Sequence, residues 1–198
     1  MNRLLAAAAL GAFLVAMATI AIASATSGGG SNTSTTATTA TATRPTSPTT
    51  TAPTPPKQVP IKLIGAGAYD PEGDGHENDD LAPQAVDGNP ATFWKTEHYT
   101  HGFFKKGVGL LLDAGARRTI SRVVVRTDGG GSSAQIQLGD SPAGPFRAVS
   151  PNRPLTEATT FMLAKGAAGR YLVVWITGVP QAIGEAHVTE VRATRTAG

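Results

Sequence analysis

The residues best suited to binding chemistry lie in one short segment, WKTEHYTHGFFKK, which runs from Trp94 to Lys106. Aromatic rings can pack on the apolar face of a sugar, while imidazole, phenol and ammonium groups can hydrogen-bond its hydroxyls. The segment therefore predicts a glycan site on a loop. Its candidate contacts are His98, Tyr99, His101, Phe103 and Lys105. The alternative is that Phe103 and Phe104 pack beneath a sheet and have a structural role.

A second polar segment, residues 70–80, carries six carboxylates and no Lys or Arg. Crowded carboxylates repel one another unless a cation lies close to them. Asp70, Glu72 and Asp74 are spaced like the first ligands of an EF-hand loop, but Leu81 stands where the last Glu of that loop belongs. An ordinary EF-hand is therefore excluded. An ion held in another geometry and a solvated acidic turn both remain open.

Motifs for catalysis are missing from the sequence. It contains no Cys, no G-x-S-x-G and no H-E-x-x-H, and the glycines at 129–131 lack the Lys of a phosphate-binding loop. The acidic residues at 70–80 belong to one turn, whereas a glycoside hydrolase needs two carboxylates on opposite walls of a cleft. The sequence predicts a protein that is not an enzyme.

Short apolar runs separated by Gly, Pro and Asp must position these loops. The runs are 61–64, 108–112, 120–126, 134–138, 159–163, 171–177 and 187–193. This spacing is typical of an all-β sandwich. Val123 and Val125 alternate with outward-facing neighbours, which indicates one solvated face, whereas residues 171–176 are apolar throughout, as in a strand covered on both faces. A short helical turn limited by Pro83 is expected at 81–85.

The chain divides by composition into three regions. Residues 1–25 contain Arg3, an uncharged apolar run and an Ala-Ser-Ala motif, which predict a signal peptide or, if it is not cleaved, an apolar membrane-anchoring helix. Residues 26–60, rich in Thr, Ser and Pro, predict a disordered linker. Residues 61–196 are expected to fold as one domain. The expected location is extracellular, either secreted or anchored to the outer face of the cytoplasmic membrane, with membrane contact only through the N-terminal segment.

The formal net charge of +3 does not by itself indicate a nucleic-acid partner. Residues 1–60 contain no Asp or Glu, and their cations are Arg3, Arg44 and Lys57. The folded domain is therefore neutral in sum. Because nucleic-acid binding needs a basic face on the folded part, no nucleic-acid partner is expected.

The segment AVDGNPATFW at 85–94 resembles the signature of discoidin-like domains, an Ala-x-Asp-Gly followed shortly by Thr-x-Trp. Residues 107–115, 120–125 and 187–191 are similar, in the same order, to later strands of that family. The resemblance implies a jelly-roll β-sandwich related to galactose-binding modules, family 32 carbohydrate-binding modules and coagulation factor V/VIII type C domains. Similar domains follow a membrane segment and a Thr/Pro linker in bacterial cell-surface proteins.

The resemblance also implies a structural calcium ion in the turn that follows Asp-Gly. The matching positions are Asp87, Asn89, Thr92 and Glu190. Calcium prefers six to eight oxygen ligands, which this set and nearby carbonyls could supply. The alternative is that Asp87 only caps its turn and Glu190 pairs with an Arg.

The function implied by the resemblance is that of a non-catalytic extracellular binding module for cell-wall or environmental carbohydrate. The alternative is a protein-interaction or sensory ectodomain, because this sandwich hosts sugar, lipid and protein ligands. The expected partner is thus a glycan or a surface protein.

Overall fold

A computed structural model describes residues 56–197 of the chain. The predicted N-terminal segment at 1–25, and the predicted linker up to residue 55, lie outside the described residues. Within residues 56–197, no helix combines the length and the apolar character needed to cross a membrane.

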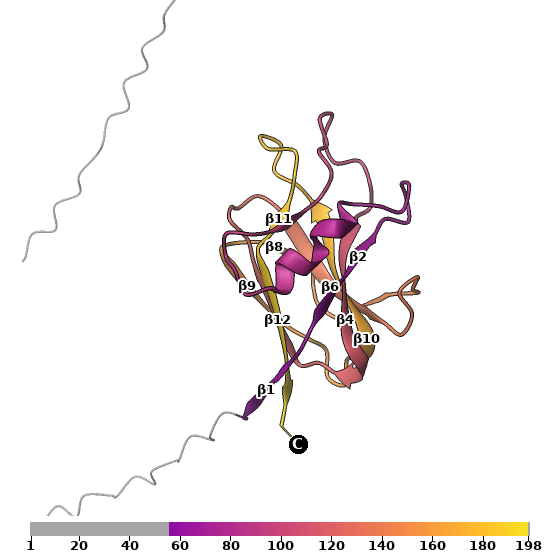
Figure 1. Cartoon of the computed structure of the whole chain (residues 1–198), viewed down its shortest axis with the longest axis vertical. Helices are drawn as coiled ribbons and strands as arrows, with labels where there is room; N and C mark the ends of the chain where they lie inside the picture. The colour runs from indigo at the N-terminus through magenta and orange to yellow at the C-terminus, as the bar shows by residue number, and fades with distance from the viewer. Residues whose placement is uncertain (1–55, 198) are drawn as a thin grey trace, which may run out of the picture. The chain divides into compact units, whose positions relative to one another are not determined.

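The described part consists of two antiparallel sheets, a short strand pair and one 3-10 helix (Figure 1). The four-stranded sheet has the order β1 (Gln58–Ile61), β12 (Glu190–Thr196), β5 (Arg122–Arg126), β9 (Ala158–Met162). The larger sheet has the order β2 (Ile64–Tyr69), β4 (Val108–Thr119), β10 (Ala168–Gly178), β6 (Ser133–Gly139), β7 (Arg147–Ala148), with β8 (Arg153–Pro154) also on β6. β3 (Trp94–Lys95) pairs with β11 (His187–Val188), and η1 spans Asp79–Val86. The predicted all-β sandwich is confirmed.

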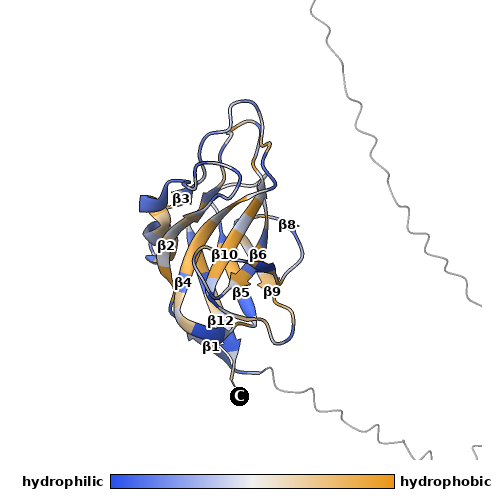
Figure 2. Cartoon of the chain, turned by 90° about the vertical axis from the view of Figure 1, so that its right-hand side faces the viewer, coloured by the Kyte–Doolittle hydropathy of each residue, from blue (hydrophilic) through white to orange (hydrophobic). Residues whose placement is uncertain are grey.

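The core lies between the two sheets, and its residues follow the two-residue period of strands. Val123 and Val125 of β5 are fully buried, as are Leu172, Val174 and Ile176 of β10. Figure 2 shows that apolar residues concentrate on the central strands and hydrophilic residues on loops. The predicted alternation in β5 is confirmed.

The outer face of β10 is covered as well. Val173 and Trp175 pack there with Tyr69 and Phe146, and the ring centroids of Tyr69 and Phe146 lie 4.8 Å apart. The neighbouring β4 carries Gly109, where a Cβ atom would overlap the side chain of Val173. The prediction of a strand covered on both faces is thus confirmed.

The first apolar run differs from its prediction. Residues 61–64 are a junction between sheets, because Ile61 ends β1 and Ile64 begins β2. β1 begins at Gln58, inside the predicted linker, and pairs with the last strand from Gln58 to Ile61. Pro60 is compatible with this strand because β1 lies at a sheet edge, where a missing N–H costs no ladder bond.

The sandwich has two chemically distinct ends. At the terminus end, β1 begins and β12 ends, with Gln58 opposite Thr196, and the chain turns from β4 to β5. The loop end holds the loops at 70–78, 96–107, 127–132 and 179–189 (Figure 1). Both segments singled out by their chemistry, 70–80 and 94–106, belong to the loop end.

Candidate functional site

The loop of residues 96–106 is joined to the loop of residues 179–186 by main-chain hydrogen bonds. The Thr96 amide donates to the Ala186 carbonyl at 3.0 Å, and the Tyr99 amide donates to the Gly184 carbonyl at 2.8 Å. Gly184 has a φ of +73°, and a Cβ atom there would lie 2.9 Å from the His98 ring. A glycine is therefore required, and the two loops form one unit.

Beneath this unit lies a buried ionic cluster. The Lys105 ammonium donates to Asp70 Oδ2 at 2.9 Å and to Glu77 Oε1 at 3.0 Å, and the Tyr99 hydroxyl also donates to Glu77. Both carboxylate side chains are fully buried, and only 7% of the Lys105 side chain is exposed. The neighbouring Lys106 binds Glu72 at 2.8 Å. The acidic segment at 70–80 thus receives its counter-ions from the next loop.

The protonation of this cluster is fixed by its partners. Burial works against the charge of Lys105, but hydrogen bonds to Asp70 and Glu77 outweigh it and hold the Lys105 pKa well above its usual value. Burial, reinforced by the hydrogen bond to Glu77, raises the pKa of Tyr99 far above that of a free phenol. Lys105 therefore stays charged and Tyr99 stays neutral at physiological pH.

The five predicted ligand contacts divide into supporting and exposed residues. Tyr99 and Lys105 are buried in the ionic cluster, and Phe103 is half-buried against the core and the Tyr99 ring. His98 and His101 are exposed. The structure thus brings all five into one loop but leaves only the two imidazoles open to solvent.

An exposed ring does exist on this loop, and it belongs to Phe104. Its side chain is 79% exposed, and it meets the edge-to-face partner Tyr99 with ring centroids 6.0 Å apart. Phe103 and Phe104 are adjacent, so in an extended segment their side chains point to opposite sides. A sequence rule that assigns only one of two adjacent rings to the core could have identified Phe104.

A chain of polar side chains, here termed the polar belt, consists of His98, Glu185, His187 and Asp128. His98 Nδ1 lies 3.3 Å from Glu185 Oε1, and His187 Nε2 lies 3.3 Å from Glu185 Oε2. His187 Nδ1 lies 2.8 Å from Asp128 Oδ2. Burial works to raise the pKa of Glu185, but hydrogen bonds from Lys95 and His187 outweigh it and hold that pKa below its usual value. Glu185 is therefore an ionised acceptor.

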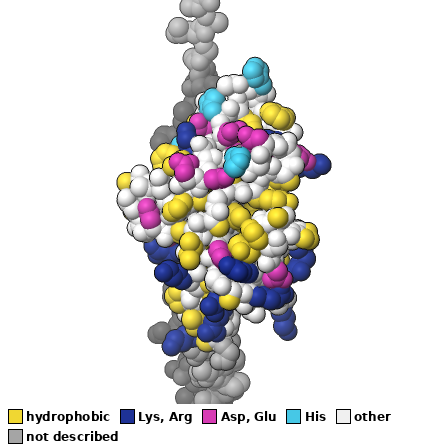
Figure 3. All heavy atoms as spheres, turned by 45° about the vertical axis from the view of Figure 1, so that its right-hand side comes forward, with side chains coloured by type: hydrophobic (Ala, Val, Ile, Leu, Met, Phe, Trp, Pro, Cys, Tyr) yellow, Lys and Arg dark blue, Asp and Glu magenta, His cyan; other side chains and the backbone are white. Residues whose placement is uncertain are grey.

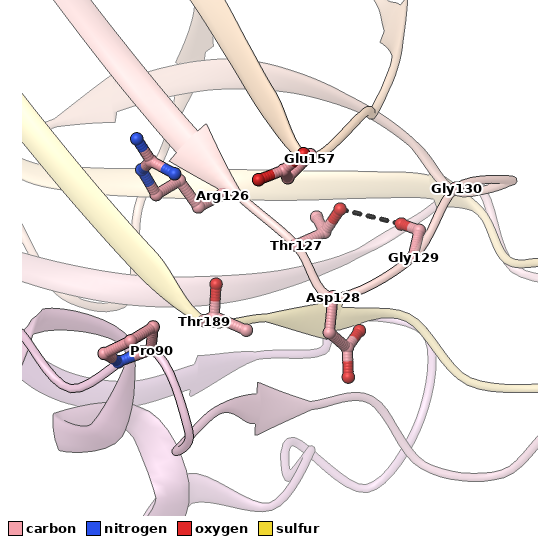
Figure 4. Close-up of a pocket in the computed structure, with 8 residues that line it drawn as sticks. All are labelled: Pro90, Arg126, Thr127, Asp128, Gly129, Gly130, Glu157 and Thr189. Carbon is pink, nitrogen blue, oxygen red and sulfur yellow. Dashed lines mark hydrogen bonds between the residues drawn. The ribbon is translucent and has the colours of Figure 1, made fainter.

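The polar belt ends at a hollow of about 460 Å³ (Figure 4). The hollow is lined by Pro90, Arg126, Thr127, Asp128, Gly129, Gly130, Glu157 and Thr189. Its loop is held by a 2.7 Å hydrogen bond from the Thr127 hydroxyl to the Gly129 carbonyl. Arg126 and Glu157 form no ion pair within residues 56–197, so both charges are available to a ligand. Asp128 belongs to both the hollow and the polar belt.

The four predicted calcium ligands, Asp87, Asn89, Thr92 and Glu190, lie together. The Thr92 hydroxyl donates to Asp87 Oδ2 at 2.8 Å, and the Asn89 amide donates to Asp87 Oδ1 at 2.8 Å. Glu190 reaches the same turn by accepting a 3.0 Å hydrogen bond from the Gly88 amide.

The donor chemistry of this turn suits calcium. All the side-chain donors are oxygens, which are the ligands that calcium prefers, and two of them come from carboxylates. Within residues 56–197 no group of three His, Cys, Asp or Glu side chains is placed to hold a metal, so an ion here would also depend on amide, hydroxyl and carbonyl oxygens. The contacts of the alternative are present too, because Asp87 caps its turn and Glu190 lies 3.5 Å from Arg192.

No model of a known protein family matches the sequence. The structure is similar to the family 32 carbohydrate-binding module of AlyQ in complex with 4,5-unsaturated mannuronic acid, with a TM-score of 0.52 and 20% identity over 68% of this chain and 97% of that one. It is also similar to the family 32 module of C. perfringens NanJ in complex with galactose, with a TM-score of 0.51 and 18% identity over 70% of this chain and 100% of that one. The domain has the fold of family 32 carbohydrate-binding modules.

A third similar structure is chitosan-binding module 1 of a chitosanase/glucanase from Paenibacillus sp. IK-5, with a TM-score of 0.52 and 18% identity over 69% of this chain and 98% of that one. The chain spans about a third (34%) of a longer AlyQ protein that joins a family 32 module to an alginate lyase domain. The galactose-binding-like fold predicted from residues 85–94 is thus confirmed. At these identities the likeness establishes the fold alone, because one fold can carry sites for different ligands.

Proposed function

We propose that the domain is a non-catalytic, extracellular glycan-binding module whose ligand lies across the loop end. The observation that carries this proposal is the continuous polar belt, which connects the hollow at Asp128 with the loop that exposes Phe104. Carbohydrate-binding modules with the same fold, including one in complex with galactose, support the ligand class.

The exposed groups match the two kinds of contact that a sugar makes. The Phe104 ring supplies an apolar surface for ring C–H groups, because Tyr99 holds it in place and solvent surrounds the rest. Asp128 accepts hydrogen bonds from hydroxyls, while Arg126 donates them. The buried cluster holds the loop that carries Phe104 in a fixed position, which lowers the entropy lost on binding.

The charge of the loop end narrows the class of glycan. This end carries five Lys and Arg residues, namely Lys95, Lys105, Lys106, Arg126 and Arg153. It carries twelve carboxylates, namely Asp70, Glu72, Asp74, Glu77, Asp79, Asp80, Asp87, Glu97, Asp128, Glu157, Glu185 and Glu190. Such an excess of negative charge repels a uronate and attracts an ammonium group. Neutral or amino sugars are the ligands that this surface fits.

The calcium ion that we propose has a structural role. Asp87, Asn89, Thr92 and Glu190 would hold the ion, which would supply a charge that ties the turn after η1 to β12. Pro90 and Thr189, one from each tied segment, line the hollow. Calcium would therefore also fix the shape of the hollow.

Replacing Phe104 with Ala is expected to weaken glycan binding by about tenfold, because the sugar loses its aromatic contact. The melting temperature should not change, since the ring is largely in solvent. Binding is measured calorimetrically on the full chain with three probes: galactose, a chitosan oligosaccharide and a mannuronate oligosaccharide.

The matched control is Met162→Ala, which removes an exposed apolar side chain from β9 at the terminus end. It should bind as the unmodified chain does. Equal affinities for Phe104→Ala and Met162→Ala would show that the loop ring does not contact the sugar.

A further inference from the structure

The charges of the domain are divided between its ends, although they nearly cancel in sum. The terminus end carries ten Lys and Arg residues, namely Lys57, Lys62, Arg117, Arg118, Arg122, Arg147, Lys165, Arg170, Arg192 and Arg195. Its acids are Asp113 and Asp140. Figure 3 shows this division on one face, with most acidic and His side chains above and most Lys and Arg side chains below. The neutral sum deduced from the sequence conceals a strongly basic face.

Local ion pairs leave most of this positive charge uncompensated. Asp113 binds Arg170 through two hydrogen bonds of 3.0 and 2.8 Å, and Asp140 binds Arg117. The terminus-end cations that form no salt bridge within residues 56–197 are Lys57, Lys62, Arg118, Arg122, Arg147, Lys165 and Arg195. In addition, Arg122 Nε is buried and has no hydrogen-bond partner in the described part of the chain.

Three of these cations converge on a hollow of about 230 Å³ between β1 and β4. Lys62, Arg118 and Arg195 line it together with residues 59–61 and Ala114, and no carboxylate belongs to its lining. Arg118 is positioned by a 3.3 Å hydrogen bond from its Nε to the Ala114 carbonyl. Three positive charges around one hollow repel one another, and an anion placed between them would offset that repulsion by attracting all three. Guanidinium groups match the oxygens of a phosphate especially well.

We propose that the terminus end docks on an anionic lipid surface, with a lipid phosphate seated between Lys62, Arg118 and Arg195. The surrounding cations face the neighbouring headgroups, each contributing a favourable interaction. Two exposed apolar side chains flank the basic face: Met162, 64% exposed and opposite Arg122 in the sheet, and Ile64, close after Lys62. Apolar side chains beside a basic cluster are typical of proteins that bind at a bilayer interface.

The course of the chain favours a lipid surface over other polyanions. β1 begins at Gln58, so the chain enters the domain at the basic end. The preceding sequence leads back to the uncharged apolar run Leu4–Ala23, which is predicted to reach a membrane. If a bilayer holds this run, the chain is tethered to it through the basic end of the domain, and the proposed glycan site lies on the loop end.

The test compares binding of the full chain to vesicles of phosphatidylglycerol and phosphatidylcholine. The apolar N-terminal run contributes to the binding of both kinds of vesicle. The ratio of the two affinities therefore reports the contribution of the basic end. Each Lys or Arg near an anionic surface raises the affinity for that surface about fivefold. The triple variant Lys62→Gln, Arg118→Gln, Arg195→Gln should therefore lower the affinity ratio by about a hundredfold. The single variant Arg118→Gln should lower it about fivefold. High salt should abolish the preference.

Arg153→Gln is the charge-matched control, because Arg153 of β8 is exposed, lies at the loop end and forms no ion pair within residues 56–197. This variant should keep the affinity ratio of the unmodified chain. Titration with inorganic phosphate tests the phosphate-binding site between Lys62, Arg118 and Arg195. The NMR chemical shifts of the backbone amides of these three residues are expected to change. The proposal fails if unmodified chain binds both vesicles equally, if Arg153→Gln loses as much as Arg118→Gln, or if phosphate shifts none of the three amides. Duplex DNA that displaces the vesicles through the same residues would assign the face to nucleic acid.

Discussion

Replacing Lys105 with Met is expected to lower the unfolding free energy by about 3 to 5 kcal/mol, because removing one partner of a buried ion pair leaves uncompensated buried charge. Asp70 and Glu77 would lose the ammonium that lies 2.9 and 3.0 Å from them, and Met would fill the space without replacing its hydrogen bonds. For a domain of this size the loss corresponds to a fall of about 10 to 17 °C in melting temperature. Circular dichroism of the full chain measures it.

Lys106→Met is the natural control, because Lys106 is adjacent, also pairs with a carboxylate, and is 89% exposed. Exposed ion pairs contribute about 0 to 1 kcal/mol, so this variant should melt close to the unmodified chain. Similar melting temperatures for both variants at neutral pH would contradict a supporting role for the buried cluster.

Calcium is expected to raise the melting temperature of the full chain by several degrees over that measured in EDTA. An ion that binds only the folded state stabilises it by about 2.7 kcal/mol at a hundred times its dissociation constant. Asp87→Ala and Glu190→Gln should each remove this response, because each supplies a carboxylate to the same turn. Magnesium should replace calcium poorly, since it requires a smaller octahedral shell.

The control for the calcium experiment is Asp140→Asn, which removes an exposed carboxylate at the terminus end. This variant should keep the full calcium response. If the unmodified chain melts equally in EDTA and in calcium, and if purified protein contains no metal, Asp87 is a turn cap and the calcium proposal fails.

The sandwich could be predicted because its signals are local. Val123 and Val125 alternate with outward-facing residues, and the apolar run at 171–176 requires cover on both faces, so periodicity alone assigns these strands. The resemblance of residues 85–94 to the discoidin-like signature also indicated how the strands are connected. The junction at residues 61–64 was missed because an apolar run looks the same whether it continues a strand or crosses between sheets.

The site was harder to predict because its contacts are distant in sequence. Lys105 reaches Asp70 and Glu77 across about thirty residues, so neither segment alone shows that the ammonium is buried. Phe103 and Phe104 are the same residue type, and only packing against Tyr99 and the core decides which ring is exposed. The basic face was hidden for a related reason, because a sum of charges does not record which end of a strand each charge occupies.

Glycan binding at the loop end is tested most directly by a glycan array probed with the full chain in calcium-containing buffer. We expect binding to neutral or amino-sugar glycans and weaker binding to uronate-containing glycans. The signal should be lost for Phe104→Ala but not for Met162→Ala. The charge of the loop end gives the order of preference, and the exposed Phe104 ring gives the dependence on the variant. An array on which the folded chain binds no glycan, or on which uronates are preferred and Phe104→Ala binds unchanged, would contradict the proposed glycan site.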